Sequence, residues 1–125
     1  MLQESGCVTA FIGFESLVPA NLAQIQDSSW KLKRLDNYSE SCQKIQSYGI
    51  QVLGSFITGL DNDTTENLLE LRDFVVENNI LGQFPFLMHL PGTELRTEMI
   101  QNGRILADGS DTNWDTVSGY DINIK

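Results

Sequence analysis

The sequence predicts an α/β fold with about three parallel strands, roughly half of a small barrel or open sheet. Three apolar runs, at 7–14, 52–57 and 83–88, contain the β-branched and aromatic residues of buried strands. Segments with helical spacing separate them, and connections of this length imply parallel pairing with right-handed crossovers. A chain of 125 residues forms one domain at most.

Composition excludes several classes of function. Charged residues make up 20% and hydrophobic residues 41% of the chain, which is ordinary for a globular domain, and its net charge of -9 makes it acidic. The one basic cluster, at 31–34, is too small for a nucleic-acid interface. No apolar run approaches the roughly 20 residues of a membrane helix, and residues 1–4 lack the features of a signal peptide. We therefore expect a cytoplasmic protein without nucleic-acid or membrane partners.

The first element is the end of a helix. Residues 1–6 look like a last helical turn with Gly6 in the terminating position, and the strand at 7–14 follows at once. A chain that opens this way looks cut from something larger. Pro19 then suits the first position of a short helix through about Gln26, with Leu22 and Ile25 facing inward.

A polar stretch leads to the second helix. Residues 27–37 lack a clear period and predict a loop with a weak helical turn. From Ser39 to Tyr48, the side chains of Cys42, Ile45 and Tyr48 fall at helical spacing, and Gly49 ends the helix. Cys7 and Cys42 occupy apolar positions of predicted elements, which favours buried free thiols.

The central strand, 52–57, leads through a polar loop into a longer helix. Asp63 is expected to cap that helix and Glu66 to complete a capping box. The apolar face of the helix, which ends near Asn78–Asn79, comprises Leu68, Leu71, Phe74, Val75 and Val76.

The last third contains the weakest strand. Pro85 lies inside the run Gln83–Met88, and a proline cannot donate to a sheet. Thr93 is a candidate cap for a helix from Glu94 to Asn102, which Gly103 ends. The stretch from Trp114 to Lys125 has no firm pattern, although residues 121–125 resemble the start of a strand.

Polar residues gather where the predicted strands end. If the strands run parallel, their carboxyl ends share one edge, and this edge would hold Glu15, Ser16, Asp61, Asp63, His89 and Thr93. Alternatives remain: Glu15 as a solvated loop residue, Asp63 as a helix cap only, and the glycines as structural bends. His89 has no second ligand at metal-binding spacing.

Three ordered motifs carry a family resemblance: Ser5–Cys7 with Phe11–Ser16, Gly49–Ile50 with Gly54–Thr64, and Leu90–Leu95. Together they resemble the second half of the radical S-adenosylmethionine barrel, in the branch often fused to a cobalamin-binding domain. The stretches at 103–106 and 114–115 are similar to the segment that comes after the barrel in that branch. The resemblance covers nearly the whole chain except residues 27–37.

The resemblance implies a fold and part of a cofactor site. Residues 1–106 would supply strands four to six of a partial TIM-like (βα)6 barrel, and 107–125 a truncated extension. Glu15 would face the ribose or amino-acid part of S-adenosylmethionine, and the segment around Phe86–Leu90 would close the adenine pocket. His89 replaces an expected proline and receives no role. The implied cofactor-binding residues are Glu15, Ser16, Gly54, Phe56, Gly59, Asp61 and Leu90.

The family's Cys-x3-Cys-x2-Cys loop is absent. That loop holds a [4Fe-4S] cluster, so the cluster, any cobalamin and the activity would belong to a longer parent, an iron–sulfur oxidoreductase or methyltransferase. The partner would be the missing half of the barrel or a second copy of the chain. Two other hypotheses are a non-catalytic binding or interaction module that self-associates, and half of an unrelated doubly wound nucleotide-binding domain.

Overall fold

The structure, a computed structural model, describes residues 1–25, 29–106, 118–120, 122 and 124–125. The chain divides into two compact units, Met1–Phe84 and Pro85–Lys125, which we describe separately. The domain boundary expected after residue 106 stays a prediction. Expected features at Asp27, Trp114–Asp115, Asp121 and Asn123 lie outside the described residues.

The first unit is built on a parallel sheet. Its strands are β1 (Thr9–Glu15), β2 (Gln51–Phe56) and β3 (Leu81–Gln83), in the order β1-β2-β3. Both pairings are parallel, with Phe11 beside Leu53 and Leu53 beside Leu81. The predicted α/β class with three parallel strands is therefore confirmed, and its open sheet is consistent with half of a partial barrel.

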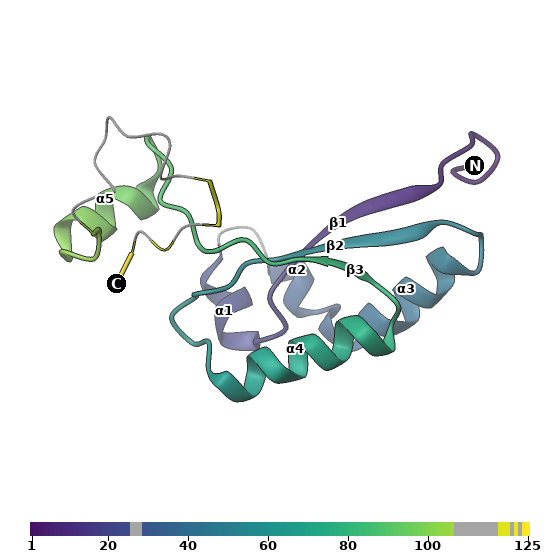
Figure 1. The fold of residues 1–125 in the computed structure, drawn as a ribbon, viewed down its shortest axis with the longest axis horizontal. Helices are drawn as coiled ribbons and strands as arrows, with labels where there is room; N and C mark the ends of the chain where they lie inside the picture. The colour runs from purple at the N-terminus through teal and green to yellow at the C-terminus, as the bar shows by residue number, and fades with distance from the viewer. Residues whose placement is uncertain (26–28, 107–117, 121, 123) are drawn as a thin grey trace. The chain divides into compact units, whose positions relative to one another are not determined.

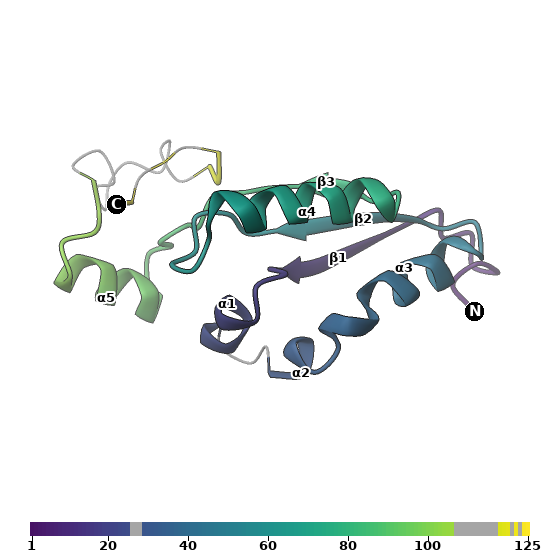
Figure 2. The same cartoon turned by 90° about the horizontal axis from the view of Figure 1, so that it is seen from below.

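All the helices of the first unit cover one face of this sheet (Figure 1), and the view in Figure 2 has them in front of it. Side chains alternate along a strand, so Phe14 and Phe56 point to the helices. Their rings stack with centroids 5.0 Å apart, and Phe74 and Tyr38 meet them edge-on. The covering elements are α1 (Pro19–Gln24), α2 (Ser29–Leu32), the 3-10 turn η1 (Leu35–Asn37), α3 (Tyr38–Gln46) and α4 (Thr65–Glu77).

On the opposite face of the sheet, two rows of residues span all three strands. Phe11, Leu53 and Leu81 are neighbours across the three strands, and Phe11 and Leu81 are 64% and 56% exposed. The next row toward the carboxyl ends, Gly13–Ser55–Gln83, contains no apolar side chain. We call this face, which none of the helices described in the first unit covers, the open face.

Three helical segments end in the same motif. Gly6 has a φ of +82°, its N–H donates to the Gln3 carbonyl, and the next N–H donates to Leu2. This is a Schellman ending, and it confirms the predicted role of Gly6. Asn79 ends α4 and Gly103 ends the later helix α5 (Glu94–Gln101) with the same pair of bonds.

The third strand lies earlier in the chain than predicted. The sequence pattern indicated Gln83–Met88, whereas β3 is Leu81–Gln83. Pro85 explains the difference, because its ring nitrogen has no hydrogen to donate to β2. The chain therefore leaves the sheet before the proline.

Four smaller expectations also need correction. Tyr48 lies beyond the end of α3 and is 52% exposed, whereas Tyr38, the first residue of α3, is buried in the core. Val76 and Leu68 are exposed on α4, which buries Leu71 and Val75. Cys7 precedes β1 and is only half-buried, while Cys42 is the buried free thiol that was expected.

The second unit contains α5 (Glu94–Gln101). Thr93 caps it by accepting from the Arg96 N–H, as predicted, and Ile105 pairs with Ile124 in an antiparallel bridge.

His89 is fully buried and contacts the Arg96 guanidinium through Nδ1, which must accept because the guanidinium only donates. In the described part of the chain no helix has the length and apolar character needed to cross a bilayer.

Candidate functional site

The first site residue, Glu15, ends β1 in a left-handed conformation. Its φ is +67°, and the register with β2 shifts between Gly13 and Glu15. A Cβ on Gly13 would lie 2.5 Å from Oε1 of Glu15, so the carboxylate occupies the space that glycine leaves open. A non-glycine residue with positive φ is strained, and such strain concentrates at functional sites.

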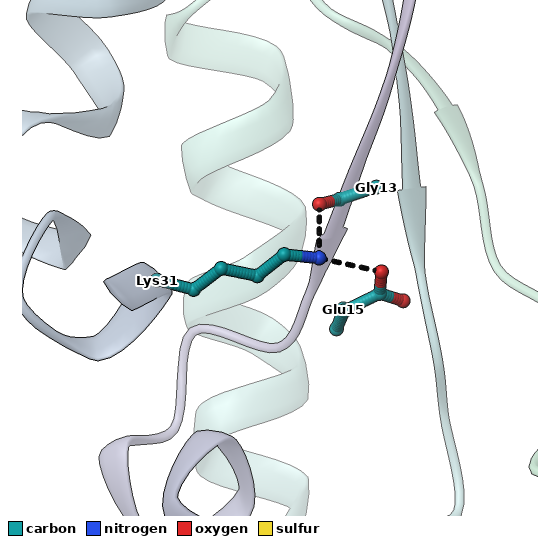
Figure 3. Close-up of polar contacts among 3 residues, drawn as sticks. All are labelled: Gly13, Glu15 and Lys31. Carbon is teal, nitrogen blue, oxygen red and sulfur yellow. Dashed lines mark hydrogen bonds and ion pairs between the residues drawn. The ribbon is translucent and has the colours of Figure 1, made fainter. Parts of the chain in front are cut away.

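Lys31 holds the Glu15 carboxylate in place. Its Nζ lies 2.7 Å from Glu15 Oε1 and 2.8 Å from the carbonyl oxygen of Gly13 (Figure 3). The lysine and glutamate side chains are 14% and 25% exposed. Glu15 is thus a paired, largely covered carboxylate and not the freely solvated loop residue of the alternative interpretation.

Tyr38 adds a third polar group near this pair. Its hydroxyl is buried and has no hydrogen-bond partner in the structure as described. Burial, and secondly the negative charge of Glu15, raise the pKa of the Tyr38 phenol. The hydroxyl therefore stays protonated beside the carboxylate at neutral pH.

The loop between β2 and α4 is closed by Asp63. Its Oδ2 accepts from the N–H groups of Gly59 (2.8 Å) and Leu60 (3.1 Å). Asp63 is therefore not the helix cap that the sequence suggested, and Glu66 does not complete the capping box. Thr64 caps α4, and its reciprocal partner is Asn67.

The two loops at the carboxyl ends of β1 and β2 meet at Asn21. This α1 side chain is 1% exposed, and its amide contacts Ser16 of the first loop and Asp63 and Asn62 of the second. The hydroxyl of Ser16 also accepts from the Val18 N–H. The structure thus brings Ser16 and the 59–63 loop together, whereas the sequence indicated only that they share an edge.

Two predicted site residues lie on the helix-covered side. A Cβ on Gly54 would lie 2.9 Å from both Ile80 and Phe56, so packing alone requires glycine there. The Phe56 side chain is fully buried in the aromatic core. Their predicted contact with a cofactor stays a prediction, and their side chains are occupied by packing.

The remaining predicted residues are peripheral or belong to the second unit. Asp61 is exposed in the loop before α4, and Gly59 has a φ of +83°. Leu90 is 41% exposed, and its carbonyl accepts from Thr93 at the start of α5. Their contacts with a cofactor stay predictions.

A cavity lies at the opposite end of the first unit's strands. It has a volume of about 410 Å³ and a largely apolar lining that includes Leu2, Ala10, Ile45 and Ile50. Ala10 and Ile50 lie near the amino ends of β1 and β2. The cavity is therefore separate from the polar groups at the carboxyl ends.

The described residues do not form a metal site. Nowhere among them do three His, Cys, Asp or Glu side chains gather closely enough to hold an ion. The whole sequence has two cysteines, and these lie before β1 and in α3. An iron–sulfur cluster therefore does not fit the residues of this chain.

Comparison with known proteins places the chain beside methyltransferases. No protein-family model matches it. It is 35% identical over 96 residues to bacteriochlorophyllide d C-12(1)-methyltransferase of Chlorobaculum tepidum, and the aligned segment covers 76% of this chain and 20% of that protein. It is 33% identical over 110 residues to hopanoid C-2 methylase of Rhodopseudomonas palustris, covering 86% and 20% respectively. An uncharacterized methyltransferase of Pyrococcus horikoshii matches over 125 residues at 29% identity, covering 99% and 26%.

These relatives agree on one class of reaction, methyl transfer. The chain spans about a fifth to a quarter of their lengths. The chain is therefore similar to one segment of proteins in this class.

Proposed function

We propose that the chain is the second half of a radical S-adenosylmethionine barrel and supplies part of the S-adenosylmethionine pocket of a parent methyltransferase. The observation that carries the proposal is the Glu15–Lys31 pair at the carboxyl end of β1. The methyltransferase relatives and the resemblance of the ordered motifs support it.

The charges of the pair suit the amino-acid end of S-adenosylmethionine. The Glu15 carboxylate accepts hydrogen bonds from an ammonium group or from a ribose diol, and the Lys31 ammonium donates to a carboxylate. Lys31 Nζ also binds the carbonyl oxygen of Gly13, which belongs to the polar row Gly13–Ser55–Gln83 of the open face. The site therefore offers both charges that a zwitterionic ligand requires.

The cluster chemistry of such a parent would lie outside this chain. Its residues do not fit an iron–sulfur cluster, so no reaction step is assigned to them, and cobalamin likewise belongs only to a full-length parent. The role proposed for this chain is to bind and orient S-adenosylmethionine.

Titration of the chain with S-adenosylmethionine and with 5′-methylthioadenosine tests this role. Calorimetry should detect S-adenosylmethionine, and Glu15→Gln and Lys31→Gln should each weaken it by about 10- to 100-fold. That range corresponds to the 1.5–3 kcal/mol of a charged hydrogen bond. Methylthioadenosine has the ribose but no amino-acid group. Unchanged affinity for it in Glu15→Gln would assign Glu15 to the amino group, and reduced affinity would assign it to the ribose.

The exposed variant Glu77→Gln on α4 is the matched control, because it removes the same charge far from the pair. It should bind as the wild type does. No binding of S-adenosylmethionine to the wild-type chain, or equal loss in all three variants, would reject the proposed site.

A second candidate function is a self-associating interaction module. The observation that favours it is the exposed row Phe11–Leu53–Leu81 on the open face, beside the outer edge of β1. In the described part of the first unit β1 has a strand neighbour on one side only, so its other edge, apart from the Gly13 carbonyl that Lys31 binds, can pair with a further strand. The same surface would accept the missing half of a barrel or a second copy of the chain.

A further inference from the structure

Asn21 joins two loops that are about forty positions apart in the sequence. Its side chain, 1% exposed, donates from Nδ2 to Asp63 Oδ1 at 2.7 Å and to Ser16 Oγ at 3.4 Å. Its Oδ1 accepts from the backbone N–H of Asn62 at 3.2 Å and from the Asn62 side chain at 3.0 Å. All of its hydrogen-bonding positions are therefore used.

The chemistry of the partners allows only one orientation of the Asn21 amide. The Asp63 carboxylate can only accept, so Nδ2 must face it, and the Asn62 backbone N–H can only donate, so Oδ1 must face that group. A buried amide that faces both a donor and an acceptor on the same loop fixes the position of that loop. Aspartate or leucine at position 21 would leave at least one of these buried groups without its partner.

The contacts continue to the two ends of the site. Asp63 uses its other oxygen, Oδ2, to hold the N–H groups of Gly59 and Leu60. On the other side, Ser16 directly follows Glu15, the carboxylate that Lys31 pairs with. Asn21 thus connects Ser16, the residue after Glu15, with Asp63, which in turn holds the turn at Gly59.

We propose that Asn21 is a positioning residue that locks the 57–64 loop to the 15–18 loop, so that the carboxyl ends of β1 and β2 present their ligand groups as one rigid site. Asn21 itself does not touch the ligand. The locking depends only on the contacts above, whereas its consequence for S-adenosylmethionine rests on the proposed function.

A swap of side chains tests the locking. Asn21→Asp places two carboxylates against each other and removes one charged hydrogen bond. Amide hydrogen exchange at Gly59 and Leu60, measured by NMR, should therefore accelerate by about tenfold or more, which is the effect expected from the loss of one such bond. The double variant Asn21→Asp/Asp63→Asn restores one donor facing one carboxylate, and the amide oxygen introduced at position 63 can still accept from the Gly59 and Leu60 N–H groups. It should return both exchange rates to within about threefold of the wild type.

Gln46→Leu is the control for general destabilisation. The side-chain amide of Gln46, on α3, donates hydrogen bonds to the carbonyls of Asn78 and Asn79 at the far end of α4. Its replacement therefore removes comparable side-chain hydrogen bonds away from both loops. It should not accelerate exchange at Gly59 and Leu60 selectively. Unchanged exchange at these amides in Asn21→Asp, or failure of the double variant to restore it, overturns the proposal.

The ligand measurement is kept separate. S-adenosylmethionine affinity should fall in Asn21→Asp and recover in the double variant, in step with the exchange rates. Affinity that stays unchanged while exchange accelerates would overturn the consequence for the ligand. If the wild-type chain binds no S-adenosylmethionine, the proposed function fails, and the exchange experiment still decides whether Asn21 locks the loops.

Discussion

The two faces of the β1-β2-β3 sheet are built from similar residues and have opposite surroundings. On the covered face, Phe14, Val52 and Phe56 pack against α3 and α4 and are almost completely buried. On the open face, Phe11, Leu53 and Leu81 lie side by side, and the outer two are more than half exposed. The helices of the first unit therefore account for only one of the sheet's two apolar surfaces.

This difference indicates where stability and function are located. The covered face stabilises the first unit through aromatic packing, and a Cβ on either of its paired glycines, Gly54 and Gly82, would lie within 3 Å of a neighbouring side chain. The open face carries the glycine over which Glu15 folds. A parallel sheet normally has both faces covered, so an apolar row on the open face is suited to a further protein surface or a ligand.

The largest expected effect compares one phenylalanine on each face. Phe56→Ala should lower the free energy of unfolding by about 3–5 kcal/mol, because it leaves a cavity in a packed core. Phe11→Ala removes the same atoms from an exposed position and, at protein concentrations low enough to keep the chain monomeric, should change the free energy of unfolding by less than about 0.5 kcal/mol. Urea denaturation of both variants measures the difference, and equal losses would mean that the open face is covered in solution.

The sequence predicted the parallel strands well, because apolar runs between helical segments allow few other arrangements. It misplaced β3, since the apolar run through Met88 is longer than the part that can pair ahead of Pro85. It also misplaced the cap of α4 by one residue. Asp63 and Thr64 both have a side-chain oxygen suited to capping, and only the competing bonds of Asp63 to Gly59 and Leu60 decide between them.

An intermediate effect is expected for self-association. We expect the wild-type chain to form dimers or larger assemblies through the open face and the outer edge of β1, because an exposed apolar row beside a strand edge without a neighbouring strand associates readily. Phe11→Lys should raise the dissociation constant by about tenfold or more, since an ammonium group would have to be buried. Sedimentation velocity across a concentration series measures this.

Val76→Lys is the matched control, because Val76 is 72% exposed on α4, on the covered side of the sheet. It should leave the dissociation constant unchanged. A wild type that stays monomeric at high concentration, or equal weakening by the two lysines, would show that the open face does not mediate association.

The candidate site was less predictable than the fold. Glu15 was identifiable because a glutamate directly after an apolar strand requires a partner, but Lys31 was not, since residues 27–37 have no period that would place it. Asn21 gave no signal at all, because its partners, Asn62 and Asp63, are brought to it only by the crossover through β2. Such contacts depend on tertiary geometry that a local pattern does not contain.

The smallest expected effect on stability concerns Tyr38, the core residue whose pKa is affected by the charge of Glu15. Burial first, and the Glu15 charge second, raise the pKa of its phenol. In the folded chain the phenol therefore keeps its proton at a pH where the unfolded chain has lost it. This preference contributes stability that is fully present below the ordinary tyrosine pKa of about 10 and is lost as the pH rises toward the folded value.

Tyr38→Phe removes both the titrating group and a buried hydroxyl with no partner in the described structure. At pH 7 the free energy of unfolding should stay within about 0.5 kcal/mol of the wild type, because an unpaired hydroxyl adds little or nothing. Above about pH 10 the variant should lose less stability than the wild type. Tyr48→Phe, at an exposed tyrosine, should leave the wild-type alkaline loss in place. Thermal unfolding from pH 7 to 11 distinguishes the two, and parallel curves for Tyr38→Phe and the wild type would show that the Tyr38 hydroxyl is solvated or hydrogen-bonded in solution.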